Sequence, residues 1–418
     1  MAVSKMIFLL RQADVAALAS VARISLVLLL LGGLVLPVAG FANGNKSGTP
    51  SQLDPEIMLT DVYRSLEANR LRDAQSKADA LVAAFPNFHL GQLVRGDLLL
   101  LHTQPIKSFG TASRGPADKL DNLRQEAIVR LKSLRERPDP HWIPSEIIQM
   151  RSDQKNILVV DARLSRLYIY GNDNGKLTLL NDYYVSQGRL GVNKFKEGDQ
   201  KTPLGVYYIT SRVAGAKLPD FYGTGALPLN YPNEWDKVNG RGGSGIWLHG
   251  TPSSSYSRPP LSSDGCVVLT NADMKYVSQE VQIGNTPVII SDDIKFVSNK
   301  QADADRLAAN KMLEAWRADL ETTDERRLRQ HYSKNFKPVR GQSLDAWLKK
   351  THQSMLGARK IDVSLDEITF FRYPGQKNLI VAAFTQAMTV GKGIHSVRKH
   401  QYWSKEGTQW KIVAEAIL

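Results

Sequence analysis

Cys266 is the only cysteine among the 418 residues of this chain, and His249 lies seventeen positions upstream of it. A cysteine attacks as the thiolate, and an imidazole brought close by the fold is the usual base that removes its proton. Backbone N–H groups must also stabilise the developing oxyanion, and Gly265 allows the sharp turn that presents such donors. These residues predict acyl transfer: the thiolate attacks a carbonyl, an amine leaves, and a second amine or water takes the acyl group.

The N-terminus predicts export. Residues 1–23 are basic, and residues 24–42 are uncharged and mostly apolar. The apolar run ends in small residues, among them Val38-Ala39-Gly40. This order is typical of a secretory signal. An uncleaved anchor is the alternative, because about 19 uncharged residues could nearly span a bilayer. Either way we expect a periplasmic or cell-envelope protein, with membrane contact only if residues 1–42 stay attached.

Export changes the meaning of the single cysteine. Cysteines of exported proteins usually pair, and Cys266 has no partner within the chain for a disulfide. We therefore expect an activated thiol that is alkylated below the ordinary thiol pH range, with a buried, inert thiol as the alternative.

The charge of the chain indicates the kind of partner. A net charge of +13 favours an anionic partner. Export argues against nucleic acid, so an anionic envelope polymer or a membrane surface is the better candidate.

The elements that must position the two residues fall into three segments. Residues 51–150 have apolar side chains at spacings of three and four, which predict a helical domain similar to a tetratricopeptide pair. Residues 155–293 alternate as strands do and predict a mainly-β domain. In residues 300–418 the residue pattern predicts helices followed by four antiparallel strands, which indicates an α+β domain. The predicted fold class is therefore multidomain α+β.

The central segment places the chemistry. Gly245-Ile246-Trp247-Leu248 alternates, so His249 should stand at the end of a strand. The loop 250–260 can then return Cys266 to the side of His249. Residues 211–243 are rich in Gly, Pro and aromatic side chains and look like a long functional loop or lid.

A family resemblance adds to this reading. The order His-Gly, a loop and then Ser-x-Gly-Cys, present here as 249–250 and 263–266, resembles the catalytic signature of the L,D-transpeptidase (YkuD-type) family. Lys-Thr-Pro-Leu-Gly at 201–205 resembles the family's segment before a core strand, and residues 161–170 resemble its opening hairpin. The resemblance covers residues 155–292.

The resemblance implies roles and a substrate. In that family the residue matching Cys266 is the nucleophile and the residue matching His249 is the base, with the backbone N–H groups of Gly265 and Cys266 as oxyanion donors. It also implies a β-sandwich-like domain and a peptidoglycan stem peptide as substrate, attacked at the L-centre of diaminopimelate before a terminal D-residue. No metal and no cofactor are implied.

Four further residues are candidates for substrate binding: Gly250, Arg258, Ser263 and Asp264. Ser263 could shape the turn or contact substrate, and Arg258 could meet a carboxylate or be solvated. Asp264 stands where many family members have histidine, and its charge should raise the pKa of the thiol. It could also attract an amine acceptor.

The outcome of the reaction stays open at this point. The Ser/Thr-Asp-Gly-Cys form resembles a YafK-like branch, whose activities include hydrolysis that detaches protein from peptidoglycan. From the resemblance to the family as a whole, we predict L,D-transpeptidation. The alternatives are an L,D-amidohydrolase or carboxypeptidase that releases an envelope protein or a D-residue, and a catalytically silent envelope-binding scaffold.

The C-terminal segment has its own resemblance. The order of helices and strands, with Gln409-Trp410-Lys411-Ile412-Val413 near the end, resembles a nuclear-transport-factor-like (SnoaL-like) domain. Such a domain forms a cone with a pocket or a dimer face.

Overall fold

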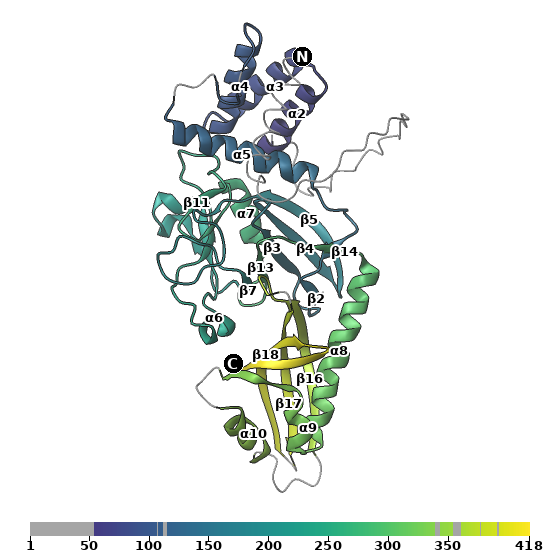
Figure 1. Cartoon of the computed structure of the whole chain (residues 1–418). Helices are drawn as coiled ribbons and strands as arrows, with labels where there is room; N and C mark the ends of the chain where they lie inside the picture. The colour runs from purple at the N-terminus through teal and green to yellow at the C-terminus, as the bar shows by residue number, and fades with distance from the viewer. Residues whose placement is uncertain are drawn as a thin grey trace, which may run out of the picture. The chain divides into compact units, whose positions relative to one another are not determined.

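The computed structural model describes residues 54–106, 108–111, 115–338, 343–353, 361–376, 378–390 and 393–418 (Figure 1). The predicted export segment, residues 1–42, lies outside this range. The chain divides into two compact units, one of residues 1–128 with 254–257 and one of residues 129–253 with 258–418. No helix in the described part of the chain is both long and apolar enough to cross a bilayer.

The first unit is helical, as the sequence predicts. It contains α2 (Pro55–Glu67), α3 (Leu71–Ala84), α4 (His89–Leu101) and the first part of α5 (Ala117–Arg135). The Asp54 carboxylate accepts the Glu56 N–H at 2.9 Å and caps α2. Tyr256 belongs to this unit, with its ring centroid 4.6 Å from that of Phe88. The helices end at Arg135, so the predicted helical segment 51–150 also contains two short strands near its end.

The second unit begins with a five-stranded sheet in the order β5-β4-β3-β13-β7. Its strands are β3 (Asn156–Asp161), β4 (Arg166–Asp173), β5 (Lys176–Tyr184), β7 (Gly205–Tyr208) and β13 (Pro287–Ser291). Strand β3 is buried along its whole length because it lies between β4 and a parallel β13. The mainly-β character predicted for residues 155–293 is confirmed by these strands.

A second sheet faces the first across a shared apolar core. Its order is β12-β10-β9-β8, with β8 (Val213–Ala214), β9 (Gly225–Pro228), β10 (Trp247–His249) and β12 (Val267–Val268). Leu248 and Val267 from this sheet share one buried cluster with Leu158 and Val288 from the first sheet. Helix α7 (Asn271–Glu280) adds Met274 to the same cluster and begins at the cap Thr270.

The interpretation of residues 211–243 as one long loop is wrong. That stretch contains β8 and β9, two 3-10 turns at Gly215–Lys217 and Asp220–Tyr222, and α6 (Glu234–Val238). Elements of two to five residues are too short to show a period, whereas the many Gly and Pro residues indicate turns.

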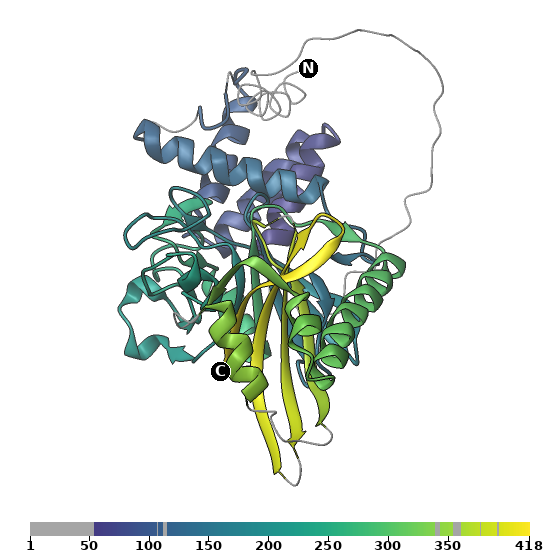
Figure 2. The ribbon, with the colours of Figure 1, turned by 60° about the horizontal axis from the view of Figure 1, so that its bottom comes forward.

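The C-terminal part of the second unit packs helices against a long sheet (Figures 1 and 2). The helices are α8 (Asn299–Glu321), α9 (Glu325–Arg329) and α10 (Leu344–Gln353). The sheet order is β15-β19-β18-β17-β16-β2, with β15 (Tyr332–Pro338), β16 (Ile361–Arg372), β17 (Leu379–Val390), β18 (Gly393–Glu406) and β19 (Gln409–Ile417). Trp316 of α8, Phe384 and Trp403 are buried together in its core.

One strand of that sheet comes from before the catalytic segment. β2 (Ile147–Gln149) pairs antiparallel with β16 as the sixth strand, while β1 (Ile143–Pro144) pairs with β14 (Phe296–Val297). The sequence did not predict β1, β2 or β15. The two domains of this unit therefore share strands as well as a connection along the chain.

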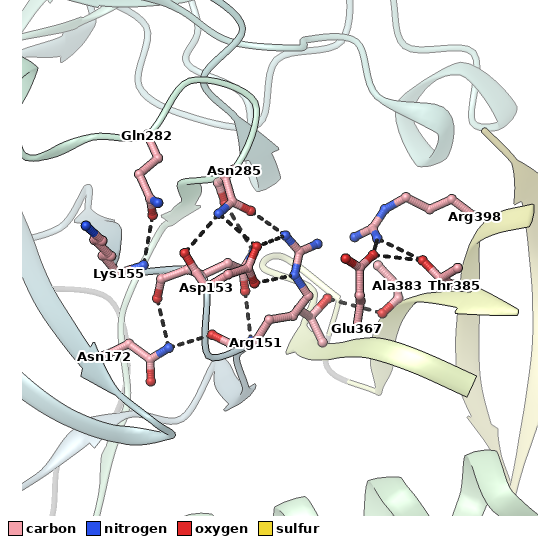
Figure 3. A network of polar contacts seen from close by, with 12 residues as sticks. Arg151, Asp153, Lys155, Asn172, Gln282, Asn285, Glu367, Ala383, Thr385 and Arg398 are labelled. Carbon is pink, nitrogen blue, oxygen red and sulfur yellow. Dashed lines mark hydrogen bonds and ion pairs between the residues drawn. The ribbon is translucent and has the colours of Figure 1, made fainter. Parts of the chain in front are cut away.

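A polar network follows β2 (Figure 3). The Arg151 guanidinium donates two hydrogen bonds to the Asp153 carboxylate, at 2.8 and 2.7 Å, and a third to Asn285. The Asn172 amide donates to the carbonyl of Arg151 at 2.7 Å. On the facing sheet, Glu367 pairs with Arg398 at 2.7 Å. The bonds of Arg151 fix the chain where it leaves β2 and enters the catalytic domain.

Candidate active site

Strands β10 and β12 position His249 and the backbone next to Cys266. The two strands are parallel, with Leu248 opposite Val267 and His249 opposite Val268. His249 is the last residue of β10, and Cys266 comes directly before β12. The predicted nucleophile and the predicted base therefore stand on two neighbouring strands, one at the start of β12 and one at the end of β10.

The turn before Cys266 depends on Gly265 and Ser263. Gly265 has a φ of +131°, and a Cβ atom there would lie 2.8 Å from the carbonyl oxygen of Lys201. The buried Ser263 hydroxyl accepts the Gly265 N–H at 3.1 Å and donates to the Cys266 carbonyl at 2.6 Å. Ser263 therefore holds the turn. The Gly265 N–H already donates to the Ser263 hydroxyl. Of the two predicted oxyanion donors, the Cys266 N–H is therefore the better candidate.

The thiol of Cys266 is held in its protonated form. Sγ donates to the carbonyl of Gly245 at 3.3 Å. Burial raises the pKa of the Cys266 thiol, and the backbone of Trp247 and the charge of Arg258 oppose that effect only in part. This direction is opposite to the expectation of an activated thiol from the sequence. The free protein therefore holds a thiol that must lose its proton during the reaction.

His249 is a neutral imidazole whose tautomer is set by the backbone. Its Nδ1 atom lies 2.7 Å from the carbonyl oxygen of Gly250. A carbonyl only accepts, so in the neutral ring Nδ1 carries the hydrogen and Nε2 has the free lone pair. Burial lowers the pKa of His249 to about 4. The rings of Phe221 and Tyr222 lie 5.6 and 5.0 Å from the imidazole and exclude water from it.

Gly250 is a positioning residue. Its N–H donates to the carbonyls of Tyr222, at 3.1 Å, and Gly225, at 3.3 Å. A Cβ atom at this position would lie 2.2 Å from Oδ1 of Asn271. The glycine allows close packing behind His249, and its carbonyl sets the histidine tautomer.

Arg258 lies beside this pair. Its carbonyl accepts the hydroxyls of Tyr184 and Ser186, each at 2.8 Å, which fixes the backbone. One guanidinium nitrogen, Nη2, donates to the carbonyl of Ser262. The guanidinium lies 5.0 Å from the centre of the Phe221 ring. The charge of Arg258 lowers the pKa of both His249 and Cys266, although burial is the larger influence on each.

Asp264 points to solvent and has a partner that the sequence did not reveal. Its side chain is 72% exposed, and Oδ1 lies 3.1 Å from Nη2 of Arg189. The charge of Asp264 contributes to the raised pKa of Cys266, as its position suggested. Arg189 and Phe221 are far from both motifs in the chain, and no periodicity or spacing marks them.

The described residues contain no group of three or more His, Cys, Asp and Glu side chains that could hold a metal ion.

Comparison with known proteins identifies two domains of the chain. Residues 155–290 match the family model of the YkuD L,D-transpeptidase catalytic domain. Residues 308–416 match the Cds6 C-terminal NTF2-like domain. No curated protein matches the chain.

Two solved structures are similar to this chain over most of their own length. Bd1075 of Bdellovibrio bacteriovorus is 26% identical with a TM-score of 0.58, over 66% of this chain and 98% of that protein. Pgp2 of Campylobacter jejuni, described as a helical cell shape determining protein, is 23% identical with a TM-score of 0.55, over 65% and 96%. By these matches, the chain combines a YkuD-type L,D-transpeptidase catalytic domain with a C-terminal NTF2-like domain.

Proposed function

We propose that this protein is an exported enzyme that acts on peptidoglycan stem peptides through an acyl-enzyme on Cys266. The observation that carries the proposal is that Cys266 directly precedes β12 while His249 ends the neighbouring parallel strand β10, within the segment that matches the transpeptidase model. Peptidoglycan peptides are the substrate class of that family.

The reaction follows from the protonation states. His249 Nε2 takes the proton of the Cys266 thiol as sulfur attacks the carbonyl of the L-centre in the stem peptide. The Cys266 N–H stabilises the oxyanion. The C–N bond breaks, the imidazolium returns the proton to the leaving amine, and a thioester remains on Cys266. An amine or a water molecule, with its proton taken by His249, then resolves the thioester.

The second nucleophile decides between two outcomes. Transfer to an amine is transpeptidation, which we propose as the main activity. Transfer to water is L,D-amidohydrolase or carboxypeptidase activity, and the exposed Asp264, at the position where many family members have histidine, favours it as the second candidate.

Mass spectrometry of tetrapeptide muropeptides tests the proposal. The mature protein is compared with Cys266→Ala and His249→Gln, and with His331→Gln as a histidine control that pairs with Asp319 in the C-terminal domain. Exchanged or cross-linked products that require Cys266 establish a transpeptidase. Cys266-dependent loss of the last residue alone establishes a carboxypeptidase.

If neither product forms, peptidoglycan with attached protein is the next substrate, because the YafK-like branch includes hydrolysis of that link. An unchanged sample there as well supports the scaffold alternative and rejects the enzyme proposal.

We also propose a cellular setting. The order of charged, apolar and small residues in 1–42 supports export to the periplasm, and the likeness to a cell shape determining protein supports a role in cell shape. Fractionation of cells, with and without residues 1–42, tests the first point. A loss of normal shape in a Cys266→Ala strain tests the second.

A further inference from the structure

The C-terminal domain holds one short helix of the catalytic domain, α6. The ring of Trp235 in α6 stacks on the ring of Tyr402 in β18, with the centroids 5.1 Å apart and the planes at 25°. Beside this stack, the Glu234 carboxylate lies 3.2 Å from Nδ1 of His400, and the two side chains are only 19% and 11% exposed. Ring stacking and a hydrogen bond shielded from water are both effective contacts. They anchor α6 to the C-terminal sheet.

A buried carboxylate extends this anchor into the catalytic domain. Asp236 of α6 is fully buried and accepts hydrogen bonds from the Asn233 N–H and the Tyr207 hydroxyl, each at 3.1 Å. Arg241 is bound to the same residue twice. Its Nη1 atom lies 3.9 Å from Oδ1 of Asp236, and its N–H donates to the Asp236 carbonyl at 2.9 Å. The chain beyond the end of α6 is therefore tied back to the helix.

The next segment, residues 240–245, depends on such anchors. Four of its six residues are glycine, so it has little conformational preference of its own. The Gly242 N–H donates to the carbonyl of Phe195 at 3.0 Å. The last residue, Gly245, supplies the carbonyl that accepts the Cys266 thiol at 3.3 Å. The position of this carbonyl, and with it the position of Sγ, follows from how the segment is held.

We infer that the C-terminal domain positions the nucleophile of the catalytic domain through α6. By holding α6 it fixes residues 240–245, and these keep the Gly245 carbonyl against the Cys266 thiol. Tyr402 and His400 are the positioning residues, because they act through α6. This inference rests on the proposed function, since it treats Cys266 as the reacting group.

The test compares Tyr402→Leu with Phe384→Leu in the full chain. Both variants remove a buried ring from the same sheet, but Phe384 belongs to the other core of the domain, where its ring lies 5.7 Å from that of Trp316. Two quantities are measured at pH 7 on protein that circular dichroism shows to be folded. One is the rate at which iodoacetamide alkylates Cys266, and the other is kcat/KM for the tetrapeptide.

The two quantities should change in opposite directions in Tyr402→Leu. Alkylation should be about threefold faster or more, because a released segment 240–245 gives water and reagent access to the thiol. The value of kcat/KM should fall about 10- to 100-fold, mainly through kcat, because the sulfur is displaced from its attacking position. Phe384→Leu should match the wild type in both.

His400→Gln covers the case in which Tyr402→Leu does not fold. It weakens the contact with Glu234 and should change both quantities in the same directions, by less. His331→Gln, at a histidine of the same domain that pairs with Asp319, is its control and should match the wild type.

Alkylation of Tyr402→Leu at the wild-type rate, or an equal change in Phe384→Leu, overturns the inference. Wild-type turnover that requires Cys266 remains in both cases, so the proposed function stands. Absence of that turnover in the wild type rejects the proposed function. Alkylation needs no substrate, so it still decides whether the C-terminal domain holds the thiol in place.

Discussion

His249 Nδ1 and the Gly250 carbonyl oxygen are 2.7 Å apart, and this bond between adjacent residues places the proton of the neutral imidazole ring on Nδ1. With Nδ1 as donor, Nε2 is left as the base. The Gly250 N–H is bound to two carbonyls, so the acceptor oxygen is itself held in place. The histidine is oriented by the backbone of the next residue, and no carboxylate among the described residues is hydrogen-bonded to its Nδ1 atom.

The pH at which kcat/KM falls on the acid side should be unusually low. Burial lowers the pKa of His249 to about 4, so the imidazole is neutral and able to accept a proton above that pH. As the pH falls through about 4, the ring becomes protonated and kcat/KM should fall tenfold per pH unit. The measurement is kcat/KM for a tetrapeptide from pH 3 to pH 8. Circular dichroism at each pH separates this limb from acid unfolding, and a limb near the ordinary histidine value would contradict the assignment.

The thiol should react slowly with alkylating agents at neutral pH. Burial raises the pKa of Cys266, so the reactive thiolate is scarcer than in an ordinary cysteine. Since Cys266 is the only cysteine, a mass shift with iodoacetamide reports this residue alone. The control is the same protein in denaturant. We expect faster alkylation of the unfolded chain at pH 7, and a faster reaction of the folded protein would show that the thiol is activated before substrate binds.

Much of the fold and the central pair were predictable from the sequence. Strands β3 and β4 show directly in the residue types as short runs of apolar and aromatic side chains, most of which are buried. Cys266 and His249 stand in a signature that fixes both their types and their order, and their catalytic roles stay predictions. The helices of the first unit and the four long C-terminal strands were predicted for the same reason of periodicity.

The environment of the site was not predictable in the same way. Whether burial or charge determines the pKa of Cys266 depends on which atoms exclude water, and Phe221 and Arg189 reach the site only through folding. The bond from Gly265 N–H to Ser263 also depends on one turn geometry. The boundaries at 51–150, 155–293 and 300–418 stay predictions, as does the signal at 1–42.

The ion pair between Asp264 and Arg189 should have a small effect on the pKa of the Cys266 thiol. Asp264 raises the pKa of Cys266, so Asp264→Asn should speed alkylation at neutral pH. Arg189→Gln should slow it, because it leaves the Asp264 charge without its partner. Both groups are at least half exposed, so we expect changes of about threefold or less that shrink as salt is added. The double variant should be close to Asp264→Asn, since Arg189 acts through Asp264. A larger effect of Arg189→Gln in the absence of Asp264 would contradict this order.

Glu146 should make the second unit less stable as the pH rises. It lies between β1 and β2, and burial raises its pKa to about 7 from an ordinary value of 4.5. The folded state thus holds a proton that the unfolded state has lost. Binding of this proton to Glu146 stabilises the folded state. The stabilisation is complete below about pH 4.5 and is lost as the pH rises through 7.

Glu146→Gln removes this dependence. We expect the variant to be more stable than the wild type at pH 8 by about 1–2 kcal/mol, and nearly equal to it at pH 5. Thermal unfolding at both values is the measurement, with the exposed Glu197→Gln as control. A stability difference that is the same at both pH values would indicate a packing effect and not a buried charge.

Gly265 should be required for both stability and activity, in contrast to another glycine with positive φ. A Cβ atom at Gly265 would meet the Lys201 carbonyl at 2.8 Å, whereas Gly284, with a φ of +76°, has nothing within 4 Å of that position. Gly284→Ala therefore measures the cost of the backbone conformation alone, about 1 kcal/mol. Gly265→Ala adds a clash and should destabilise the protein by about 2–4 kcal/mol.

Because the clash moves the turn that carries Cys266, we expect kcat/KM to fall by about 100-fold or more in Gly265→Ala. Gly284→Ala should keep wild-type kcat/KM. Denaturant unfolding and peptide turnover of both variants check this. Equal stability of the two, with full activity of Gly265→Ala, would show that the turn can relax without displacing the nucleophile.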